Sequence, residues 1–456
     1  MSFPAYPAYR ESGVEWIGRV PSGWQIARLK TLADVRPSGV DKHSIEGEVP
    51  VRLCNYVDVY KNDRITAELA FLEATATPSE IERFTLAAGD VLITKDSETP
   101  DDIAAAALVD RSADSVVCGY HLALLRPAPG RLSGAFLFWS LKATGSLAQF
   151  SVRAQGITRF GLTTAAMGDV LLAVPPPAEQ LALATFLDRE CGKIDALVAE
   201  QERLIGLLKE KRQAVISHAV TKGLDPHAPM KDSGVEWLGQ VPAHWEVTRL
   251  GYRYEVQLGR MLNEARSQGD DLRPYVRVFD VQWGRINVED LPLMDFPPDA
   301  RARYLLEPGD LLVNEGGSYV GRSAIWHGEI AECYYQKALH RVRPLDHDGD
   351  TTAFLNYVME LATRLGAFVA GGNQTTIDHL TAEKLRAHRF AFPPRHEQDL
   401  IAEVLEHRLL ELDTLTAEAH RAIALLRERR AALISAAVTG KIDVRGLVAP
   451  EKAQAA

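Results

Sequence analysis

Two long stretches of the chain carry apolar side chains in alternating steps of three and four residues. The first seam runs through Ile194, Leu197, Gln201, Leu204, Leu208, Lys211 and Val215. The second runs through Leu412, Leu415, Ala419, Ala422, Leu426, Arg429 and Leu433. This is the spacing of a coiled-coil seam, so it predicts two long amphipathic helices. Matched stripes favour packing of one helix on the other; the alternative is that each helix lies on its own domain.

Start and stop signals frame both predicted helices, with prolines before each start, an acid in each first turn and a glycine at each end. They are Pro176, Pro177, Glu179 and Gly223 for the first helix, and Pro393, Pro394, Glu397 and Gly440 for the second. Each helix should run for about 40 residues, or about 60 Å. The sequence therefore predicts long spacer helices within residues 176–224 and 393–442.

The segments before the two helices are rich in strand patterns and carry few helical ones. The strand-like strings are VPVRLCNYVDV, GDVLIT and SVVCGYHLALL in the first segment, and YVRVFDVQW, GDLLVN and RSAIWHGEI in the second. Each segment should form a mixed α+β domain with a largely antiparallel, twisted sheet. The predicted order is a first domain (1–175), a helix (176–224), a second domain (225–392), a helix (393–442) and a flexible tail (443–456).

The two halves are copies of one unit, offset by about 220 residues. The opening ESGVEWIGRVPSGWQIARL from Glu11 matches DSGVEWLGQVPAHWEVTRL from Asp232. Further pairs follow in the same order: GDVLIT with GDLLVN, LLRP with RVRP, PPPAEQ with PPRHEQ, and AVTKGLD with AVTGKID. Similarity is greatest in the openings and helices, while polar positions in the strand-rich parts differ. The similar parts should meet identical partners and the divergent parts two different ones.

Composition narrows the class of protein. With 46% hydrophobic and 25% charged residues the chain is typical of soluble globular proteins. The net charge of -10 argues against a surface that binds nucleic acid all over, but local basic faces remain compatible with it. No apolar run is long enough to span a bilayer and no secretion signal is visible, which predicts a cytoplasmic protein without membrane contact. The four cysteines lie far apart and should be reduced, buried thiols.

The sequence shows no motif for catalysis or metal binding. The Gly-Lys pairs at Gly192 and Gly440 lack the other positions of a phosphate loop, and the histidines lack zinc-protease spacing. Asp310 with Glu315, and Asp90 with Glu98 in the other copy, could serve as nuclease carboxylates. Gly-Asp before an apolar strand is typical of a turn, however, and the two glutamates do not align between the copies. We therefore predict no catalytic residue, no metal site and no cofactor in this chain.

Basic and polar residues in the divergent segments are candidates for DNA contacts, because arginine, asparagine and glutamine bind phosphates and base edges. In the first segment they are Arg52, Asn55, Lys61, Arg64 and Lys95. In the second they are Arg260, Arg266, Arg273, Arg277 and Arg285. Acidic residues near the second group reduce its net positive charge. The alternative to DNA contact is therefore that these arginines form a solvent-exposed edge of the domain.

A polar loop precedes each spacer helix and adds further candidates. The loops are RAQGITRFGLT, with Arg153, Gln155 and Arg159, and GGNQTTIDHLT, with Asn373, Gln374 and Thr375. Capping of a following helix is the alternative role for such residues, and it suits Thr163 and Thr381.

The doubled openings, GD turns, helix starts and helix ends together resemble the specificity subunits of bacterial type I restriction-modification systems. The resemblance covers nearly the whole chain, although the loop AQGITRFGLT departs from the family's pattern. It implies two target-recognition domains, each reading one part of a bipartite, asymmetric double-stranded DNA site, separated by two antiparallel helices.

The resemblance also implies partners. Members of the family are not enzymes themselves; they hold two methyltransferase subunits, which methylate adenine with S-adenosylmethionine, and restriction subunits that use ATP and Mg²⁺. Ile194, Leu197, Leu204, Leu208, Val215, Leu412, Leu415, Leu426 and Leu433 would form the coiled coil and docking surface. A self-contained DNA-binding nuclease and a protein-binding scaffold are the alternative functions.

Overall fold

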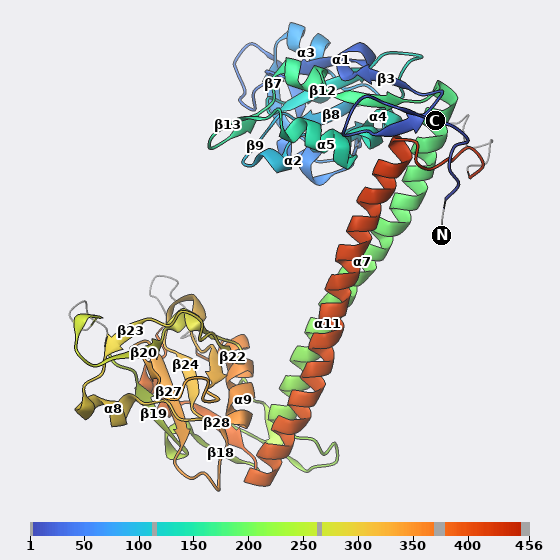
Figure 1. Ribbon diagram of the computed structural model, residues 1–456. Coiled ribbons are helices and arrows are strands. Elements are labelled where there is room, and N and C mark those ends of the chain that lie inside the picture. Colours follow the sequence, from blue (N-terminus) through green and yellow to red (C-terminus); the bar gives the residue numbers. More distant parts are fainter. Residues whose placement is uncertain (1–2, 112–115, 262–266, 369–378, 448–456) are drawn as a thin grey trace. The chain divides into compact units, whose positions relative to one another are not determined.

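The computed structural model describes residues 3–111, 116–261, 267–368 and 379–447 of the chain. The chain divides into two units: unit 1 holds residues 1–202 and 420–456, and unit 2 holds residues 203–419. Each unit combines sheets with short helices and parts of two long helices (Figure 1). The predicted α+β fold class is confirmed.

The main sheet of unit 1 has the strand order β4–β12–β8–β10–β6 and is antiparallel except between β10 and β6. Its strands are β4 (Ala33–Pro37), β12 (Leu122–Pro127), β8 (Val91–Thr94), β10 (Ala106–Val109) and β6 (Arg64–Ile65). A second sheet consists of β11 (Val116–Cys118), β5 (Val49–Cys54) and β7 (Leu72–Ala76), in that order.

Shorter pairings and helices complete unit 1. The pairings are β1 (Tyr9–Glu11) with β2 (Arg19–Pro21), β15 (Leu171–Val174) with β3 (Gln25–Arg28), and β13 (Gln155–Gly156) with β14 (Phe160–Gly161) and β9 (Asp96–Ser97). The helices are α1 (Leu29–Leu32), α2 (Tyr56–Lys61), α3 (Pro78–Phe84), η1 (Pro100–Asp102), α4 (Gly134–Leu141), α5 (Thr144–Ser151) and α6 (Thr164–Gly168).

Unit 2 repeats this plan. Its antiparallel main sheet has the order β19 (Tyr254–Leu258), β27 (Leu339–Pro344), β24 (Leu311–Asn314) and β25 (Ser323–Ile325). Beside it lie β23 (Leu293–Asp295), β20 (Leu272–Val276) and β26 (Tyr334–Tyr335), and the pairs β16 (Met230–Asp232) with β17 (Gln240–Pro242), β18 (Glu246–Arg249) with β28 (Arg389–Phe392), and β21 (Val281–Gln282) with β22 (Arg285–Ile286). The helices are η2 (Leu250–Tyr252), η4 (Val278–Asp280), α8 (Pro298–Tyr304), η5 (Gly317–Tyr319), α9 (Thr352–Arg364) and α10 (Ala382–Ala387).

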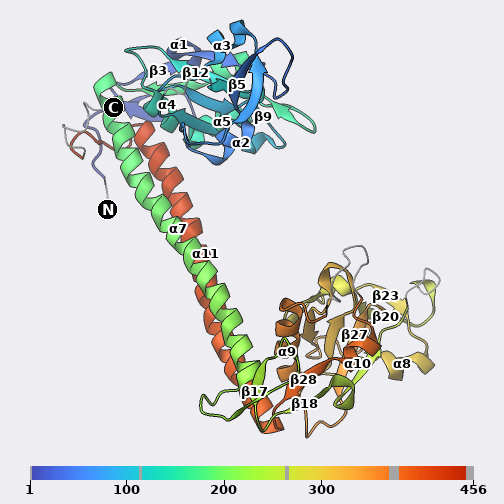
Figure 2. The ribbon, with the colours of Figure 1, turned by 180° about the vertical axis from the view of Figure 1, so that it is seen from behind.

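The two long helices are α7 (Pro177–Lys222) and α11 (Arg395–Val438), and each contributes to both units. In unit 1, Arg430 lies 2.8 Å from Asp195, and Arg427 lies 3.1 Å from Glu202. Residue numbers therefore rise along one helix as they fall along the other, which is antiparallel packing (Figure 2). The favoured prediction, that the two long helices pack on each other, is confirmed within unit 1.

Both GD motifs lead into strands that are buried on two sides. In β8, Val91 and Ile93 enter one hydrophobic core while Leu92 enters the core on the other face of the sheet. In β24, Leu311 and Leu312 divide in the same way. Successive side chains of a strand point to opposite faces, so a strand between two cores must be apolar throughout.

The aspartate of each GD motif is a structural partner of the arginine in the later RP motif. Asp90 accepts hydrogen bonds from Arg126 at 2.9 and 2.7 Å, and Asp310 accepts from Arg343 at 2.6 and 2.8 Å. Both carboxylates are buried, and each also accepts a backbone N–H of its own turn at 2.8 Å. This bidentate pairing explains why the two motifs recur together.

The PPPAEQ and PPRHEQ motifs attach each long helix to its domain through a buried glutamine. Gln180 accepts from the Ser133 N–H at 2.8 Å, and Gln398 accepts from the Thr351 N–H at 3.0 Å. Each glutamine amide also donates to a backbone carbonyl of its own helix start, at 3.0 Å. The repeated glutamine therefore satisfies backbone groups that would otherwise be buried without partners.

The glycine at the end of each long helix lies against the repeated opening. Gly440 has φ +72°, and a Cβ there would lie 2.3 Å from Pro21 and 3.3 Å from Trp24. Gly223 has φ +71° and lies in the same way against Pro242 and Trp245. Both the left-handed backbone and the close approach require glycine.

Residues 443–447 differ from the prediction of a flexible tail. Val444 is fully buried, and the Asp443 N–H donates to the Pro4 carbonyl at 2.8 Å. Arg445 holds the Asp443 carboxylate and lies over the Tyr6 ring, 4.9 Å from its centroid. These residues pack on unit 1 because Val444 adds an apolar side chain to its core.

The four cysteines are free and buried, as the sequence predicts. None of the described helices is long and apolar enough to cross a membrane.

Candidate nucleic-acid interface

The hairpin of β13 and β14 carries the first predicted reading loop. Strand β14 pairs with β9, which places Gly161 opposite Asp96. Gln155 and Arg159 are exposed on this hairpin, and Lys95 directly precedes β9. Helix α2 lies beside β9 in both views (Figures 1 and 2). The fold thus brings three of the predicted DNA contacts to one edge of unit 1, which we call the hairpin edge: strands β9, β13 and β14 with helix α2.

Asp96 organises the charges of the hairpin edge. Arg159 donates to its Oδ1 at 2.7 Å, and the His121 Nδ1 lies 2.8 Å from its Oδ2. The Arg159 side chain remains 58% exposed despite this ion pair, so its other nitrogen atoms face solvent. An arginine held at one end and open at the other is well placed to donate to a phosphate or a guanine.

Lys95 is held against the same edge. Its Nζ donates to the Ser38 carbonyl at 2.9 Å and lies 4.4 Å from the centroid of the exposed Tyr120 ring. Burial lowers the pKa of Lys95, while Asp96 acts in the opposite direction. The ammonium group therefore has a fixed position beside an exposed aromatic ring.

A hollow of about 440 Å³ separates helix α2 from the hairpin. Tyr56 and Tyr60 line one side, with ring centroids 5.5 Å apart in a stacked arrangement. Thr158 and Arg159 line the other side. Asp96, Glu98 and Asp102 also line the hollow, so the hairpin and α2 share a polar, aromatic and partly acidic surface.

The other predicted residues of unit 1 are more scattered. Asn55 caps α2 by accepting from the Val57 N–H at 2.9 Å, and Lys61 is exposed in the last turn of that helix. Arg52 lies over the Phe71 ring at 5.8 Å, and Arg153 donates to a carbonyl of α5 at 2.7 Å. Asn55 and Lys61 therefore belong to the hairpin edge through α2, whereas Arg52 and Arg153 have local structural contacts.

Arg64 lies elsewhere. Its guanidinium group forms ion pairs with Asp110 at 3.0 Å and with Asp188 of α7 at 2.5 Å, and it lies 5.2 Å from the Phe138 ring centroid. These contacts neutralise its charge within unit 1 and join the domain to the long helix. The structure does not bring Arg64 to the hairpin edge.

In unit 2 the turn after β20 corresponds to the start of α2 in unit 1. Arg277 is the N-cap residue of η4, the position that Asn55 has in unit 1, but its side chain makes no capping hydrogen bond; Asp280 matches Asp58. Both aspartates accept the backbone N–H of the capping residue at 2.8 Å. Phe279 is exposed at the top of this turn.

The remaining arginines of unit 2 have different surroundings. Arg273 forms an ion pair with Glu332 at 3.1 Å, and Arg260 lies 5.3 Å from the Phe296 ring centroid. Arg285 is exposed and forms no ion pair within the described ranges. Arg266, Asn373, Gln374 and Thr375 lie outside the described residues. The predicted DNA contacts of both units remain predictions.

The described residues that follow the second predicted reading loop pair at the place equivalent to the end of the hairpin in unit 1. His379 forms an antiparallel bridge with Gly316, and the Leu380 N–H donates to the Glu315 carbonyl at 2.6 Å. In unit 1 the equivalent pairing is Gly161 with Asp96. Both loops therefore attach at the end of the strand that the GD motif starts.

Sequence reasoning missed several residues of these surfaces: Tyr56, Tyr60, Tyr120, His121, Phe279, Tyr319 and Arg322. One reason is that VPVRLCNYVDV and YVRVFDVQW were interpreted as continuous strands. The strands end at Cys54 and Val276, and the chain then turns. In unit 1, Asn55 followed three residues later by Asp58 is a capping-box signal that would have located the turn. In unit 2 the N-cap residue is Arg277, and the sequence carries no such signal.

The predicted seam of the long helices is only partly buried. Ile194, Leu208, Leu412 and Leu433 are buried, and Val215 and Leu426 are half-buried. Leu197, Leu204 and Leu415 are exposed. Since a two-helix pair covers each helix on one side only, these leucines offer apolar surface to another molecule.

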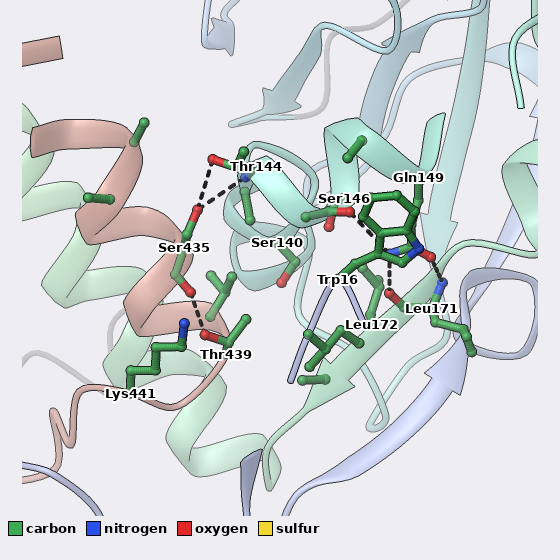
Figure 3. A pocket seen from close by; sticks show the side chains of 18 of the residues that line it. Trp16, Ser140, Thr144, Ser146, Gln149, Leu171, Leu172, Ser435, Thr439 and Lys441 are labelled. Carbon is green, nitrogen blue, oxygen red and sulfur yellow. Dashed lines mark hydrogen bonds between the residues drawn. The ribbon is translucent and has the colours of Figure 1, made fainter. Parts of the chain in front are cut away.

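A larger hollow, of about 580 Å³, lies in unit 1 between α5, β15 and the end of α11 (Figure 3). Its polar groups bind one another: Ser435 accepts from the Thr144 N–H at 3.1 Å, and the Gln149 amide pairs with both backbone groups of Leu171. Trp16 lines the hollow and is half exposed. The bond to Ser435 holds the end of α11 to α5, and the bonds of Gln149 join α5 to β15.

Within the described ranges, no three histidine, cysteine or acidic side chains are grouped so that they could hold a metal ion.

Comparisons with known proteins agree with the repeat architecture. Residues 242–422 match the family model of the type I restriction modification DNA specificity domain. The chain is 21% identical over 445 residues to the type I restriction enzyme EcoKI specificity subunit of Escherichia coli K12, covering 94% of this chain and 91% of that protein. It is 23% identical over 309 residues to the EcoBI specificity subunit of Escherichia coli, covering 66% and 64%.

Two solved structures share the fold. A chain from the study "Structural basis underlying complex assembly and conformational transition of the type I R-M system" has a TM-score of 0.71 at 17% identity, covering 93% of this chain and 99% of that one. The HsdS subunit of Thermoanaerobacter tengcongensis has a TM-score of 0.54 at 16% identity, covering 93% and 98%.

Proposed function

This chain belongs to the specificity subunits of type I restriction-modification systems, and on that premise we propose that each unit reads one part of a bipartite, asymmetric DNA sequence. The two units share their supporting ion pairs and buried glutamines but differ at the edge where the reading loop attaches. Lys95 follows the central strand in unit 1, and Glu315 follows it in unit 2. The proposal is carried by one observation: the two units are held together by the same contacts, but they differ in charge at the edge where the reading loop attaches.

Base readout depends on which donors and acceptors face the grooves, so two surfaces of different polarity should select different bases. In unit 1, Arg159 and Gln155 lie on the hairpin beside Lys95. In unit 2, Arg285 is exposed, and the sequence of the second predicted reading loop contains the amide residues Asn373 and Gln374. The expected target is therefore asymmetric.

We further propose that the long helices hold two copies of one methyltransferase subunit. Leu197 of α7 and Leu425 of α11 are exposed in unit 1, and their counterparts Leu415 of α11 and Leu207 of α7 are exposed in unit 2. Two equivalent apolar patches in one chain suit two identical partners. The partners would supply S-adenosylmethionine-dependent methylation of adenine, and a restriction subunit would supply the reactions that use ATP and Mg²⁺.

The test is methylation mapping at single-base resolution in cells that express this chain with its methyltransferase. We expect N-methylated adenine in a two-part motif with a fixed gap. Exchange of residues 30–173 for the same segment of a relative should change one half of the motif only. Arg159→Ala should cost about 1–3 kcal/mol of discrimination and relax the same half.

Four outcomes would contradict this function. Methylation of a continuous motif, or a change in both halves after the exchange, would rule out the division of labour between units. Metal-dependent cleavage by the purified chain alone would favour a nuclease, and sequence-independent binding by the assembled complex would favour a protein scaffold.

Docking is tested by co-purification. Leu197→Glu should release one methyltransferase copy and Leu197→Glu with Leu415→Glu should release both, because a charge cannot be buried in an apolar contact without a partner. Glu202→Gln, on the surface of the same helix, is the control and should retain both copies. Retention of both copies by the double variant would contradict the proposed docking surface.

A further inference from the structure

The turn that follows the central strand of the second sheet presents an exposed apolar side chain in each unit. Phe279 follows β20 and is 55% exposed, and Val57 follows β5 and is 51% exposed. Single exposed apolar side chains are common on protein surfaces, but these two occupy equivalent positions of the repeat, which makes the turn a candidate contact surface.

Both turns are held rigidly. In each unit the third residue of the turn, Asp58 or Asp280, accepts the backbone N–H of the capping residue at 2.8 Å. Asp280 is only 1% exposed and lies beneath the turn. This hydrogen bond, one half of a capping box, fixes the backbone from which the exposed side chain projects.

In unit 2 an arginine fixes the aromatic ring as well. Arg277 donates to both oxygens of Asp280, at 2.8 and 2.9 Å, and its guanidinium carbon lies 4.1 Å from the centroid of the Phe279 ring. The bidentate ion pair and the ring contact occupy this guanidinium group. Arg277 therefore supports Phe279 and is not itself directed at a ligand.

Polar groups suited to DNA surround Phe279. Gln282 donates to the Phe279 carbonyl at 2.7 Å and accepts from Arg322 at 2.6 Å. Arg322 lies 4.4 Å from the centroid of the half-exposed Tyr319 ring. Tyr319 ends η5, which begins at Gly317, directly after the residue that pairs with His379. The turn thus lies on the same surface as the attachment of the second reading loop.

In unit 1, Val57 lies next to a residue of the hollow that Asp96, Glu98 and Asp102 also line. Its neighbour Tyr56 lines the hollow whose far side is formed by Arg159 of the reading hairpin. The two units therefore share this turn, whose second residue is a valine in one unit and a phenylalanine in the other.

We propose that Phe279 and Val57 contact the C5 methyl group of a thymine in the major groove, one in each half of the target, and that Arg277 is a positioning residue for Phe279. The inference rests on the proposed function. The thymine methyl group is the apolar feature of the major groove, and valine and phenylalanine side chains match it where charged groups do not.

The experiment measures the affinity of the assembled complex for duplexes of the mapped target sequence in which each thymine is replaced in turn by deoxyuridine, which lacks the methyl group. In the wild-type complex, replacement at one position of the second half should weaken binding about fourfold, the factor that one buried methyl group carries. Phe279→Ala should bind the thymine and deoxyuridine duplexes equally at that position, and Phe279→Leu should restore the difference.

Further variants separate the proposed contact with the thymine methyl group from a general loss of binding. Val57→Ala should abolish the thymine preference in the first half only. Leu345→Ala, which shortens an equally exposed side chain of unit 2 outside the turn, should leave both halves unchanged. Arg277→Ala should weaken the thymine preference at the Phe279 position without abolishing binding, and Arg277→Lys should restore part of it.

The outcomes distinguish this inference from the function on which it rests. A wild-type complex without a preference for a bipartite sequence would overturn the proposed function. A wild-type complex that is specific for its target, combined with a Phe279→Ala variant that keeps every thymine preference, would overturn the methyl contact alone.

Discussion

Arg430 of helix α11 lies 2.8 Å from Asp195 of helix α7, and the same ion pair recurs in the other unit with the helices exchanged. There Arg212 of α7 lies 3.8 Å from Asp413 of α11. Each arginine also binds an acid of its own domain: Asp63 in unit 1, at 2.9 Å, and Glu360 in unit 2. One arginine per unit therefore joins both long helices to the domain.

Replacing Arg430 by alanine should destabilise unit 1 by about 2 kcal/mol, because two carboxylates lose a charged hydrogen-bonding partner. The guanidinium group also lies 5.6 Å from the Trp139 ring centroid, and this contact would be lost. The measurement is the urea midpoint of the full chain.

Arg427→Ala is the matched control. Arg427 pairs with Glu202 on the same helices, but both side chains are more than half exposed. Exposed ion pairs contribute about 0.2–1 kcal/mol, so this change should be small. Equal effects of the two substitutions would contradict a structural role for the Arg430 cluster.

Low pH should weaken the cluster that Arg430 forms with Asp63. Burial alone would raise the pKa of Asp63, but Lys142 and Arg430 outweigh it and hold the pKa below its usual range. A carboxyl group with a lowered pKa in the folded state stabilises the fold at neutral pH, and this contribution is lost as pH falls below about 4, the ordinary aspartate value. The melting temperature should therefore fall less steeply between pH 5 and pH 3 in Asp63→Asn than in the wild type. Parallel curves for the two proteins would refute this assignment.

Alanine substitutions of Leu208 and Leu204 in α7 should differ sharply in their cost to stability, although both residues belong to the predicted seam. Leu208 is 7% exposed in the core of unit 2, and Leu204 is 40% exposed. Leu208→Ala should cost about 2–4 kcal/mol through lost burial and a cavity, whereas Leu204→Ala should cost less than about 1 kcal/mol. Chemical denaturation of both variants tests this, and a reversed order would show that the seam is shifted.

The reading hairpin should depend on Gly156. Its φ is +153°, and a Cβ would lie 1.9 Å from the Arg159 carbonyl oxygen. Gly156→Ala should therefore distort the hairpin and weaken binding to the first half of the target by about tenfold, the effect of roughly 1.4 kcal/mol of strain. Gly161→Ala, where the nearest atom to a Cβ is 3.9 Å away, should be tolerated. Gel shifts with duplexes altered in one half of the target at a time measure both effects. Equal binding by the two variants would contradict a role of the hairpin in DNA binding.

The thiols should be unreactive in the native protein. Burial raises the pKa of Cys191 and of Cys333 to about 12, so little thiolate exists at pH 8. Ellman's reagent should react slowly with the native chain and rapidly with all four cysteines in urea. Fast stoichiometric labelling without denaturant would show that a thiol is accessible.

The sequence by itself determined the repeated scaffold. The long helices follow from periodic apolar positions, and the turn at Asp90 follows from Gly-Asp before an apolar strand, because these features depend on residues close together in the chain. The repeat also showed that LLRP and RVRP matter, but not that Arg126 and Arg343 bind Asp90 and Asp310. That pairing joins strands far apart in the sequence.

The tertiary structure alone decided which charged residues are available for a ligand. Arg64 and Arg277 look like equal candidates in the sequence, yet Arg64 binds Asp188 of α7 and Arg277 binds the buried Asp280 beneath Phe279. Composition and spacing give the number of arginines in a segment, but ion pairs depend on where distant acids lie after folding. For the same reason the exposed Phe279 could be found only from the fold, since local pattern assigns it to a strand.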